Sequence, residues 1–351
     1  MQFAKRAFYQ SIQLAPLSLL KQLDPNRLLL PYHHLVSDAP VPHIKHLYPF
    51  KGIAAFEQDL DYLLQHFTPV TLPEVIRSVQ EQRPLSPYSF LLSFDDGLRQ
   101  VKDFIAPMLY RKGIPGAFFL NTGFLDNKLL FYKFKISLLI EALQQTTYSH
   151  AVLTAVGAIL PGQPAGGRDA VIAALRRITW HNRHLADEAG ALLEITFDDY
   201  LSKEKPFLES AEVQQLIDQG FGIGGHSIDH PYYTQLTLEE QLHQTCTSVN
   251  DLAVQFQLPY KAFAFPHSDA GVSRSFFDTV FDPAMPLLDI VFGTANHRRD
   301  IHPAILHRFN CERPHISIQQ AVKGVLLYDV VKRRLLPADI SRNPVAEPDK
   351  K

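Results

Sequence analysis

The stretch Tyr88-Ser89-Phe90-Leu91-Leu92-Ser93-Phe94-Asp95-Asp96-Gly97 decides the interpretation of this sequence. Its first seven residues form a continuous apolar run, which is typical of a parallel strand that is covered on both faces. Two adjacent carboxylates follow the run, and Gly97 permits the backbone to turn sharply after them. One carboxylate can then face a metal ion while its neighbour faces a reacting water molecule. The alternative is a surface turn, because Asp-Gly is a common turn signal.

The apolar runs around this stretch alternate with segments of helical periodicity. Strands are expected at 28–33, 88–94, 115–120, 221–224, 261–265, 287–292 and 304–309. Helices are expected at 56–67, 73–82, 101–112, 211–219, 238–256, 273–281 and 317–334. Such alternation implies parallel pairing through right-handed crossovers, and therefore an α/β fold. A closed or partly closed (β/α) barrel fits the number of strands better than an open sheet.

Three departures from this alternation set the expected domain organisation. Residues 1–27 are expected to form an N-terminal helical segment, and residues 28–336 the barrel domain. Within that domain, residues 131–205 are helix-rich without a comparable strand signal, and we interpret them as a helical insertion. The polar, proline-containing segment 337–351 is expected to be a flexible tail.

Composition narrows the classes of partner. The chain has 351 residues and a formal net charge of -2, and this charge argues against nucleic acid as a partner. Its two cysteines are too few for a disulfide framework. No apolar run approaches the roughly 20 residues of a membrane-spanning helix, and no clear signal peptide is visible, so a cytoplasmic location is the default. The amphipathic character of residues 1–20 leaves peripheral membrane contact open. Nothing indicates the oligomeric state.

The stretch His226-Ser227-Ile228-Asp229-His230 supplies two imidazoles four residues apart. On a helical turn this spacing puts both rings on one face, so both can reach one ion. Two histidines and one aspartate make a metal site with open positions, and a second aspartate remains as a base. Two solvated or structural histidines are the alternative interpretation.

Further candidates lie at or near the carboxyl ends of predicted strands, where (β/α) barrels carry their chemistry. The stretch FAFPH at 263–267 is expected to form a groove wall or a buried strand end. His307 could protonate a leaving amine, and Arg308 could orient a catalytic carboxylate. His33 and His34 could contact a substrate. The alternative for the histidines is a structural role, and the alternative for Arg308 is a surface ion pair.

Taken together, these motifs resemble the polysaccharide deacetylase family, the carbohydrate esterases of NodB homology. SFDDG at 93–97 and HSIDH at 226–230 carry the resemblance. PYHH at 31–34, FEQDLDYLLQHFTPVTLPEVI at 56–76 and RKGIPGAFFL at 111–120 add to it. It covers roughly residues 28–125 and 209–310 and leaves the helical insertion outside.

The resemblance implies a distorted (β/α) barrel and hydrolysis of a linear amide C–N bond. The enzyme would remove acetyl groups from N-acetylated sugars of a polysaccharide, an oligosaccharide or a glycan precursor. Asp96, His226 and His230 match the metal ligands, Asp95 matches the general base, and His307 matches the general acid. The cofactor would be a divalent ion, Zn²⁺ first, with Co²⁺, Ni²⁺ or Mn²⁺ as alternatives.

The sequence also departs from the family pattern. The stretch FAFPH lacks the arginine that often precedes the proline, and the single tryptophan, Trp180, lies in the insertion. The substrate pocket and the partner of the base therefore stay open. Two rival functions also remain: a non-haem Fe(II) oxygenase, which the same ligand set would suit, and a non-catalytic glycan-binding or scaffold protein that keeps the fold.

Overall fold

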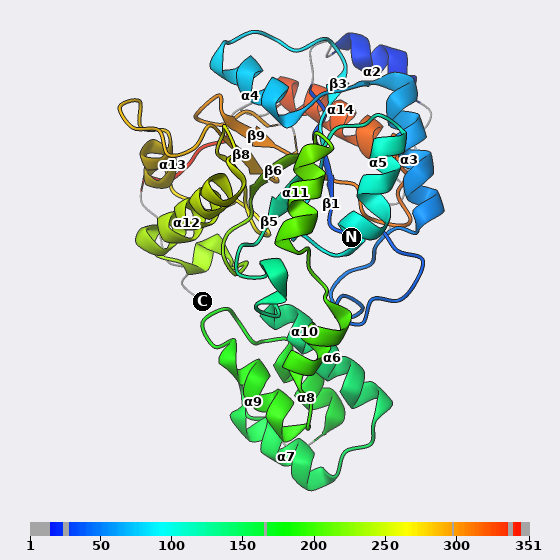
Figure 1. Cartoon of the computed structure of the whole chain (residues 1–351), viewed down its shortest axis with the longest axis vertical. Helices are drawn as coiled ribbons and strands as arrows, with labels where there is room; N and C mark the ends of the chain where they lie inside the picture. Colours follow the sequence, from blue (N-terminus) through cyan, green and yellow to red (C-terminus); the bar gives the residue numbers. More distant parts are fainter. Residues whose placement is uncertain (1–14, 24–27, 165–166, 297, 336–339, 345–351) are drawn as a thin grey trace.

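The computed structural model describes residues 15–23, 28–164, 167–296, 298–335 and 340–344. Its main feature is one sheet of eight short strands, all parallel, in the order β10-β1-β4-β5-β6-β7-β8-β9 (Figure 1). The strands are β1 (Pro31–His33), β4 (Leu92–Phe94), β5 (Gly116–Leu120), β6 (Gly222–Gly225), β7 (Ala262–Ala264), β8 (Ile290–Gly293), β9 (Ile305–His307) and β10 (Phe309–Asn310).

The last two strands nearly close this sheet into a barrel. Only Arg308 separates β9 from β10 along the chain. β9 pairs with β8, whereas β10 pairs with β1, so one short segment joins the two edges of the sheet. The predicted α/β class and barrel architecture are thereby confirmed.

Helices surround the barrel, as the alternating pattern predicts (Figure 1). They are α3 (Ile53–His66), α4 (Leu72–Gln80), α5 (Ala106–Arg111), α11 (Ser210–Asp218), α12 (Leu238–Phe256), α13 (Arg274–Val280) and α14 (Ile318–Leu335). α3 buries Phe56, Leu60 and Leu63, which share one face at helical spacing. α4 and α12 each begin with a capping box, formed by Thr71 with Glu74 and by Thr237 with Glu240.

The expected strand at 88–94 is divided in two. β3 (Ser89–Phe90) pairs with β2 (Thr68–Pro69) outside the barrel, and only β4 enters it. Leu91 lies between the two strands and donates its backbone N–H to Leu29. A run of apolar residues shows burial but does not show which neighbour each part pairs with.

Five helices between β5 and α11 form a lobe beside the barrel (Figure 1). They are α6 (Tyr132–Gln145), α7 (His150–Ile159), α8 (Arg168–Leu175), α9 (His184–Leu192) and α10 (Phe197–Glu204). The lobe has its own apolar core, which Leu35, Val41 and Ile44 from the loop after β1 join. This loop therefore packs between the lobe and the carboxyl ends of the barrel strands.

The two ends of the chain are described only in part. Within the expected N-terminal helical segment, α2 (Leu17–Leu23) buries Leu20. Within the expected tail, residues 340–344 contact the barrel, and the Arg342 side chain is buried against Asp269 and Asp300. The rest of both segments lies outside the described residues. No helix in the described ranges has the length and apolar character needed to cross a membrane.

Candidate active site

Asp95 and Asp96 follow β4, at the carboxyl end of the barrel strands. Asp96 and Gly97 both have positive φ, 72° and 66°, so the backbone turns sharply at this point. A Cβ on residue 97 would lie 2.9 Å from the Leu120 side chain, which together with the positive φ explains the glycine. The turn lets the two adjacent carboxylates take different partners.

Asp96, His226 and His230 form a compact buried cluster. The Asp96 Oδ1 atom lies 3.5 Å from Nε2 of His226 and 3.1 Å from Nε2 of His230. One ligand atom from each residue falls within 4.8 Å of the others. These three atoms are buried, and apart from one another they have no hydrogen-bond partner among the described residues. Convergent, unpartnered O and N donors are what a tetrahedral divalent ion needs, so the residues fit a metal.

The backbone holds the two imidazoles without a helix. We expected a helical turn at 226–230, but this segment is a loop in which Ser227 and His230 have φ of 71° and 61°. The Oγ atom of Ser227 accepts the His230 N–H at 3.0 Å, and Asn121 bonds the Ser227 Oγ at 3.2 Å. Hydrogen bonds from the Ser227 and Asn121 side chains therefore fix the positions of the two histidines, in place of the helical hydrogen bonds that we expected.

His226 is oriented as a metal ligand would be. Its Nδ1 donates to the carbonyl oxygen of Ala264 at 2.7 Å, which leaves Nε2 with its lone pair toward Asp96. Burial lowers the pKa of His226 to about 4, so the imidazole is neutral near pH 7. Burial raises the pKa of Asp96, but the neighbouring His230 outweighs this and holds it below its usual range.

Asp95 forms a bidentate ion pair with Arg308, the residue between β9 and β10. The two guanidinium nitrogens lie 2.6 Å from Oδ1 and 2.8 Å from Oδ2, and Arg308 also donates to Ser93. Arg308 has no exposed surface. Burial alone would raise the pKa of Asp95, but the paired guanidinium lowers it, so the carboxylate stays ionised. The expectation that Arg308 orients a carboxylate is confirmed.

His307 does not lie beside Asp95 or the Asp96, His226 and His230 cluster. Its Nε2 lies 2.9 Å from Asp300, its Nδ1 accepts the N–H of Ala295 at 3.2 Å, and its side chain is fully covered. It does not line the cavity described below. Adjacent residues on an extended strand point to opposite sides, so Arg308 facing Asp95 directs His307 away.

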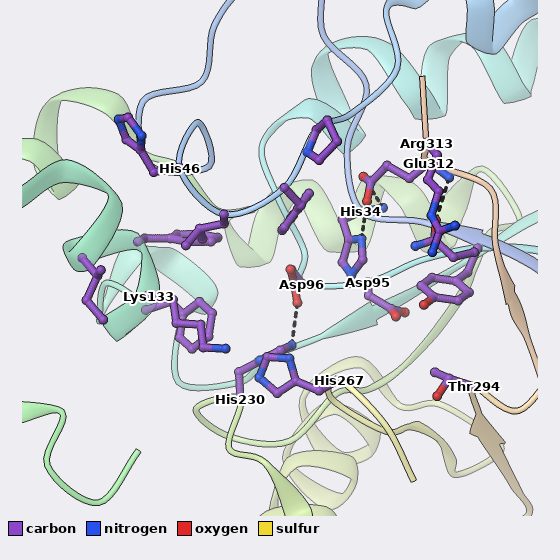
Figure 2. A pocket seen from close by; sticks show the side chains of 18 of the residues that line it. His34, His46, Asp95, Asp96, Lys133, His230, His267, Thr294, Glu312 and Arg313 are labelled. Carbon is purple, nitrogen blue, oxygen red and sulfur yellow. Dashed lines mark hydrogen bonds and ion pairs between the residues drawn. The ribbon is translucent and has the colours of Figure 1, made fainter. Parts of the chain in front are cut away.

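His34 was expected only to contact a substrate, but its position suits a proton donor. Figure 2 shows its ring between Glu312 and Asp96. Nδ1 lies 2.7 Å from Oε2 of Glu312, whose Oε1 accepts the N–H groups of His34 and Leu35 at 3.0 Å. Burial lowers the pKa of His34, but the Glu312 ion pair and hydrogen bond more than offset this and raise it to about 10. His33 faces away and packs against Phe56 and Phe94.

These side chains open into a cavity of about 1480 Å³ between the barrel mouth and the helical lobe. His34, Asp95, Asp96 and His230 line it, as do residues of α6 and of the loop after β1. Within FAFPH, Phe265 and His267 line the cavity, which confirms the groove-wall interpretation, whereas Phe263 is a core residue. The volume exceeds that of most small-molecule pockets. The involvement of Glu312 and of the helical lobe had no local signal in the sequence.

Comparison with known proteins gives a consistent result. Residues 198–275 match the family model described as polysaccharide deacetylase. No curated protein matches the chain. The structure is similar to the deacetylase PplD of Streptococcus pyogenes in complex with acetate, with a TM-score of 0.53, 12% identity, 85% of this chain and 98% of that chain.

Two further structures are similar at the same level. A polysaccharide deacetylase from Bacillus cereus gives a TM-score of 0.51 at 11% identity, over 86% of this chain and 69% of that one. A de-N-acetylase from Aggregatibacter actinomycetemcomitans gives 0.50 at 12% identity, over 85% and 99%. At these identities the structures establish the barrel fold, and the family match covers the segment that contains His226 and His230.

Proposed function

We propose that this chain, which resembles the polysaccharide deacetylases in fold and in the sequence of residues 198–275, is a metal-dependent hydrolase. Its reaction is removal of acetyl groups from N-acetylated sugars of a glycan or glycan precursor. The observation that carries the proposal is the convergence of three buried donor atoms, on Asp96, His226 and His230, which contact one another but no other polar partner among the described residues, beside a separately held carboxylate. A structural histidine pair would have hydrogen-bond partners for its buried nitrogens.

The ligand set suits a divalent ion, with zinc as the first candidate and cobalt, nickel or manganese as alternatives. When bound, such an ion supplies Lewis acidity to an acetyl carbonyl and lowers the pKa of a water molecule. Asp96 contributes the negative charge that retains a cation, and the neutral His226 contributes a lone pair. The parallel barrel makes the oxygenase alternative less suitable, because we expect that chemistry in other folds.

Asp95 is the base in this proposal. Arg308 occupies one lone pair on each carboxylate oxygen, which fixes the plane of the group and leaves further lone pairs toward the cavity. The carboxylate stays ionised and can take a proton from a water molecule. Arg308 thus fills the position that the sequence analysis left open.

His34 is the proton donor in this proposal, in place of His307. It is in the cavity, faces Asp95 and Asp96, and carries a proton because Glu312 stabilises its charge. Its Nε2 is free to protonate the departing amine, since Nδ1 bonds Glu312. His307 has both ring nitrogens engaged and no access to the cavity.

Acetate release tests the proposal. The protein is loaded with zinc or cobalt and incubated with an N-acetylglucosamine tetramer, with and without a chelator. We expect acetate only with metal, and an Asp95→Asn variant that keeps its metal but loses turnover. Tight glycan binding without acetate release under all metals would instead support the non-catalytic scaffold alternative.

A further inference from the structure

The side chains that line the cavity carry more positive than negative charges. Each carboxylate in the lining has a cationic or histidine partner: Arg308 for Asp95, His230 for Asp96 and His34 for Glu312. Three cations in the same lining, Lys133, Arg176 and Arg313, form no ion pair with any described residue. A divalent ion at Asp96 would add to the positive charge. The cavity therefore favours a ligand that carries negative charge.

Lys133 is the best placed of the three cations, because the protein fixes its direction. Its ammonium donates to the Tyr232 hydroxyl at 2.7 Å and lies 4.3 Å from the centre of that ring. A neutral phenol orients an ammonium but does not neutralise it. Lys133 is also in the first turn of α6, where the helix dipole opposes a cation and favours an anion.

A row of rings connects Lys133 to the candidate metal cluster. Tyr232 stacks on His267 with 3.7 Å between ring centres, and His267 lies 4.3 Å from His230 in an edge contact. Only the rings of Tyr232 and His267 separate the ammonium from His230. A short oligosaccharide is long enough to reach from one to the other. Figure 2 shows Lys133 and His230 on the same wall of the cavity.

We propose that this site takes N-acetylated glycans that carry an anionic substituent, a carboxylate or a phosphate, and that Lys133 binds this substituent. The inference rests on the proposed deacetylase function. A carboxylate or phosphate next to Lys133 would add a charge-assisted hydrogen bond to the one already made with Tyr232. A neutral N-acetylglucosamine polymer would leave the ammonium without an anion.

Lys135 provides the matched control, two residues along the same helix. Its ammonium is 2.5 Å from Asp187 and it does not line the cavity. Replacing either lysine with methionine removes one positive charge from α6 and keeps an unbranched side chain. Only the Lys133→Met change removes a charge from the cavity.

The test compares acetate release from paired probes by the metal-loaded enzyme. The pairs are the N-acetylglucosamine tetramer with the hyaluronan tetrasaccharide, and N-acetylglucosamine with its 1-phosphate. We expect kcat/KM to be roughly tenfold higher for at least one anionic member, mainly through KM, and to fall with added salt. Lys133→Met should abolish this preference and Lys135→Met should keep it. The pair that shows the preference identifies the carboxylate or the phosphate as the substituent.

Equal kcat/KM for both members of each pair, or an equal loss on both in Lys133→Met, would overturn the inference while leaving the deacetylase intact. Absence of acetate from all probes would instead overturn the proposed function. In that case the dissociation constants of the same probes decide the inference, measured by calorimetry on the Asp95→Asn variant. Tighter binding of an anionic probe that Lys133→Met removes supports it, and equal binding overturns it.

Discussion

Arg308 binds both carboxylate oxygens of Asp95, which follows the next strand but one in the sheet, although 213 positions separate the two residues in the sequence. Arg308 lies where the chain passes from β9 to β10, so the residue that closes the barrel is also the residue that holds the proposed base. Barrel closure and the geometry of the site therefore depend on one another.

Removal of the Arg308 charge should destabilise the fold. Arg308→Met leaves the Asp95 carboxylate buried without its cation, which costs about 3–5 kcal/mol in comparable pairs. Urea unfolding would measure the loss, and the Asp95→Asn, Arg308→Met double variant should recover part of it. A double variant no more stable than Arg308→Met alone would show that the pairing contributes nothing specific.

Arg308→Lys tests orientation separately from charge. Lysine keeps the cation but cannot bond both oxygens in one plane. We expect kcat for acetate release to fall about a hundredfold with little change in KM, because a misoriented base slows proton transfer more than substrate binding. A variant that keeps full kcat would separate the bidentate contact from the reaction.

His34 and His307 should respond differently to the same substitution. His34→Gln removes the proposed proton donor and should lower kcat about 10²–10⁴-fold, and it should also lower stability because the buried Glu312 carboxylate loses its cationic partner. His307→Gln alters a buried contact with Asp300, so its main effect should be on the unfolding free energy. Turnover numbers and urea midpoints of both variants decide the assignment. A larger kcat loss in His307→Gln would restore that residue as the general acid.

Bound metal should stabilise the native protein. A ligand that binds only the folded state raises the unfolding free energy by about 2.7 kcal/mol at 100 times its dissociation constant. Thermal unfolding with increasing zinc should therefore show a rising Tm, which a chelator reverses. His230→Ala should lose most of this shift. His302→Ala is a suitable control, since its ring stacks on Phe281 away from the cavity. An equal Tm shift in His230→Ala would place the ion elsewhere.

Local pattern was enough to predict the barrel and the position of the site. Apolar runs between helical segments gave strands, and the carboxyl ends of parallel strands meet at one edge, so Asp96 and His226 could be placed together. Their partners could not be predicted, because the contact between His34 and Glu312 spans 278 positions and depends on how the barrel closes.

The choice between His307 and Arg308 illustrates the same limit. Both lie at the end of an apolar strand, and a period of two puts them on opposite sides. Which of them faces the barrel interior depends on the pairing of β9 with β8 and of β10 with β1, which no short segment encodes. Likewise, the spacing of His226 and His230 fitted a helix, whereas side-chain caps hold them in a loop.

Acid should weaken the contact between residues 340–344 and the barrel. Burial raises the pKa values of Asp269 and Asp300, but His307 and Arg342 outweigh it and hold both below the ordinary value of 3.8. The folded protein therefore binds fewer protons than the unfolded chain at low pH. The stabilisation is fully present above the ordinary carboxyl pKa and is lost as the pH falls toward the folded values.

Arg342→Met should remove much of this acid dependence. The variant should be less stable than the wild type at pH 7, and the difference should shrink between about pH 5 and pH 2 as both carboxylates are protonated in either protein. Urea unfolding across this range would measure it. Arg274→Met is the matched control, because its partner Asp278 is exposed and the pair should contribute little. Parallel stability curves for Arg342→Met and the wild type would show that Arg342 does not govern the ionisation of Asp269 and Asp300.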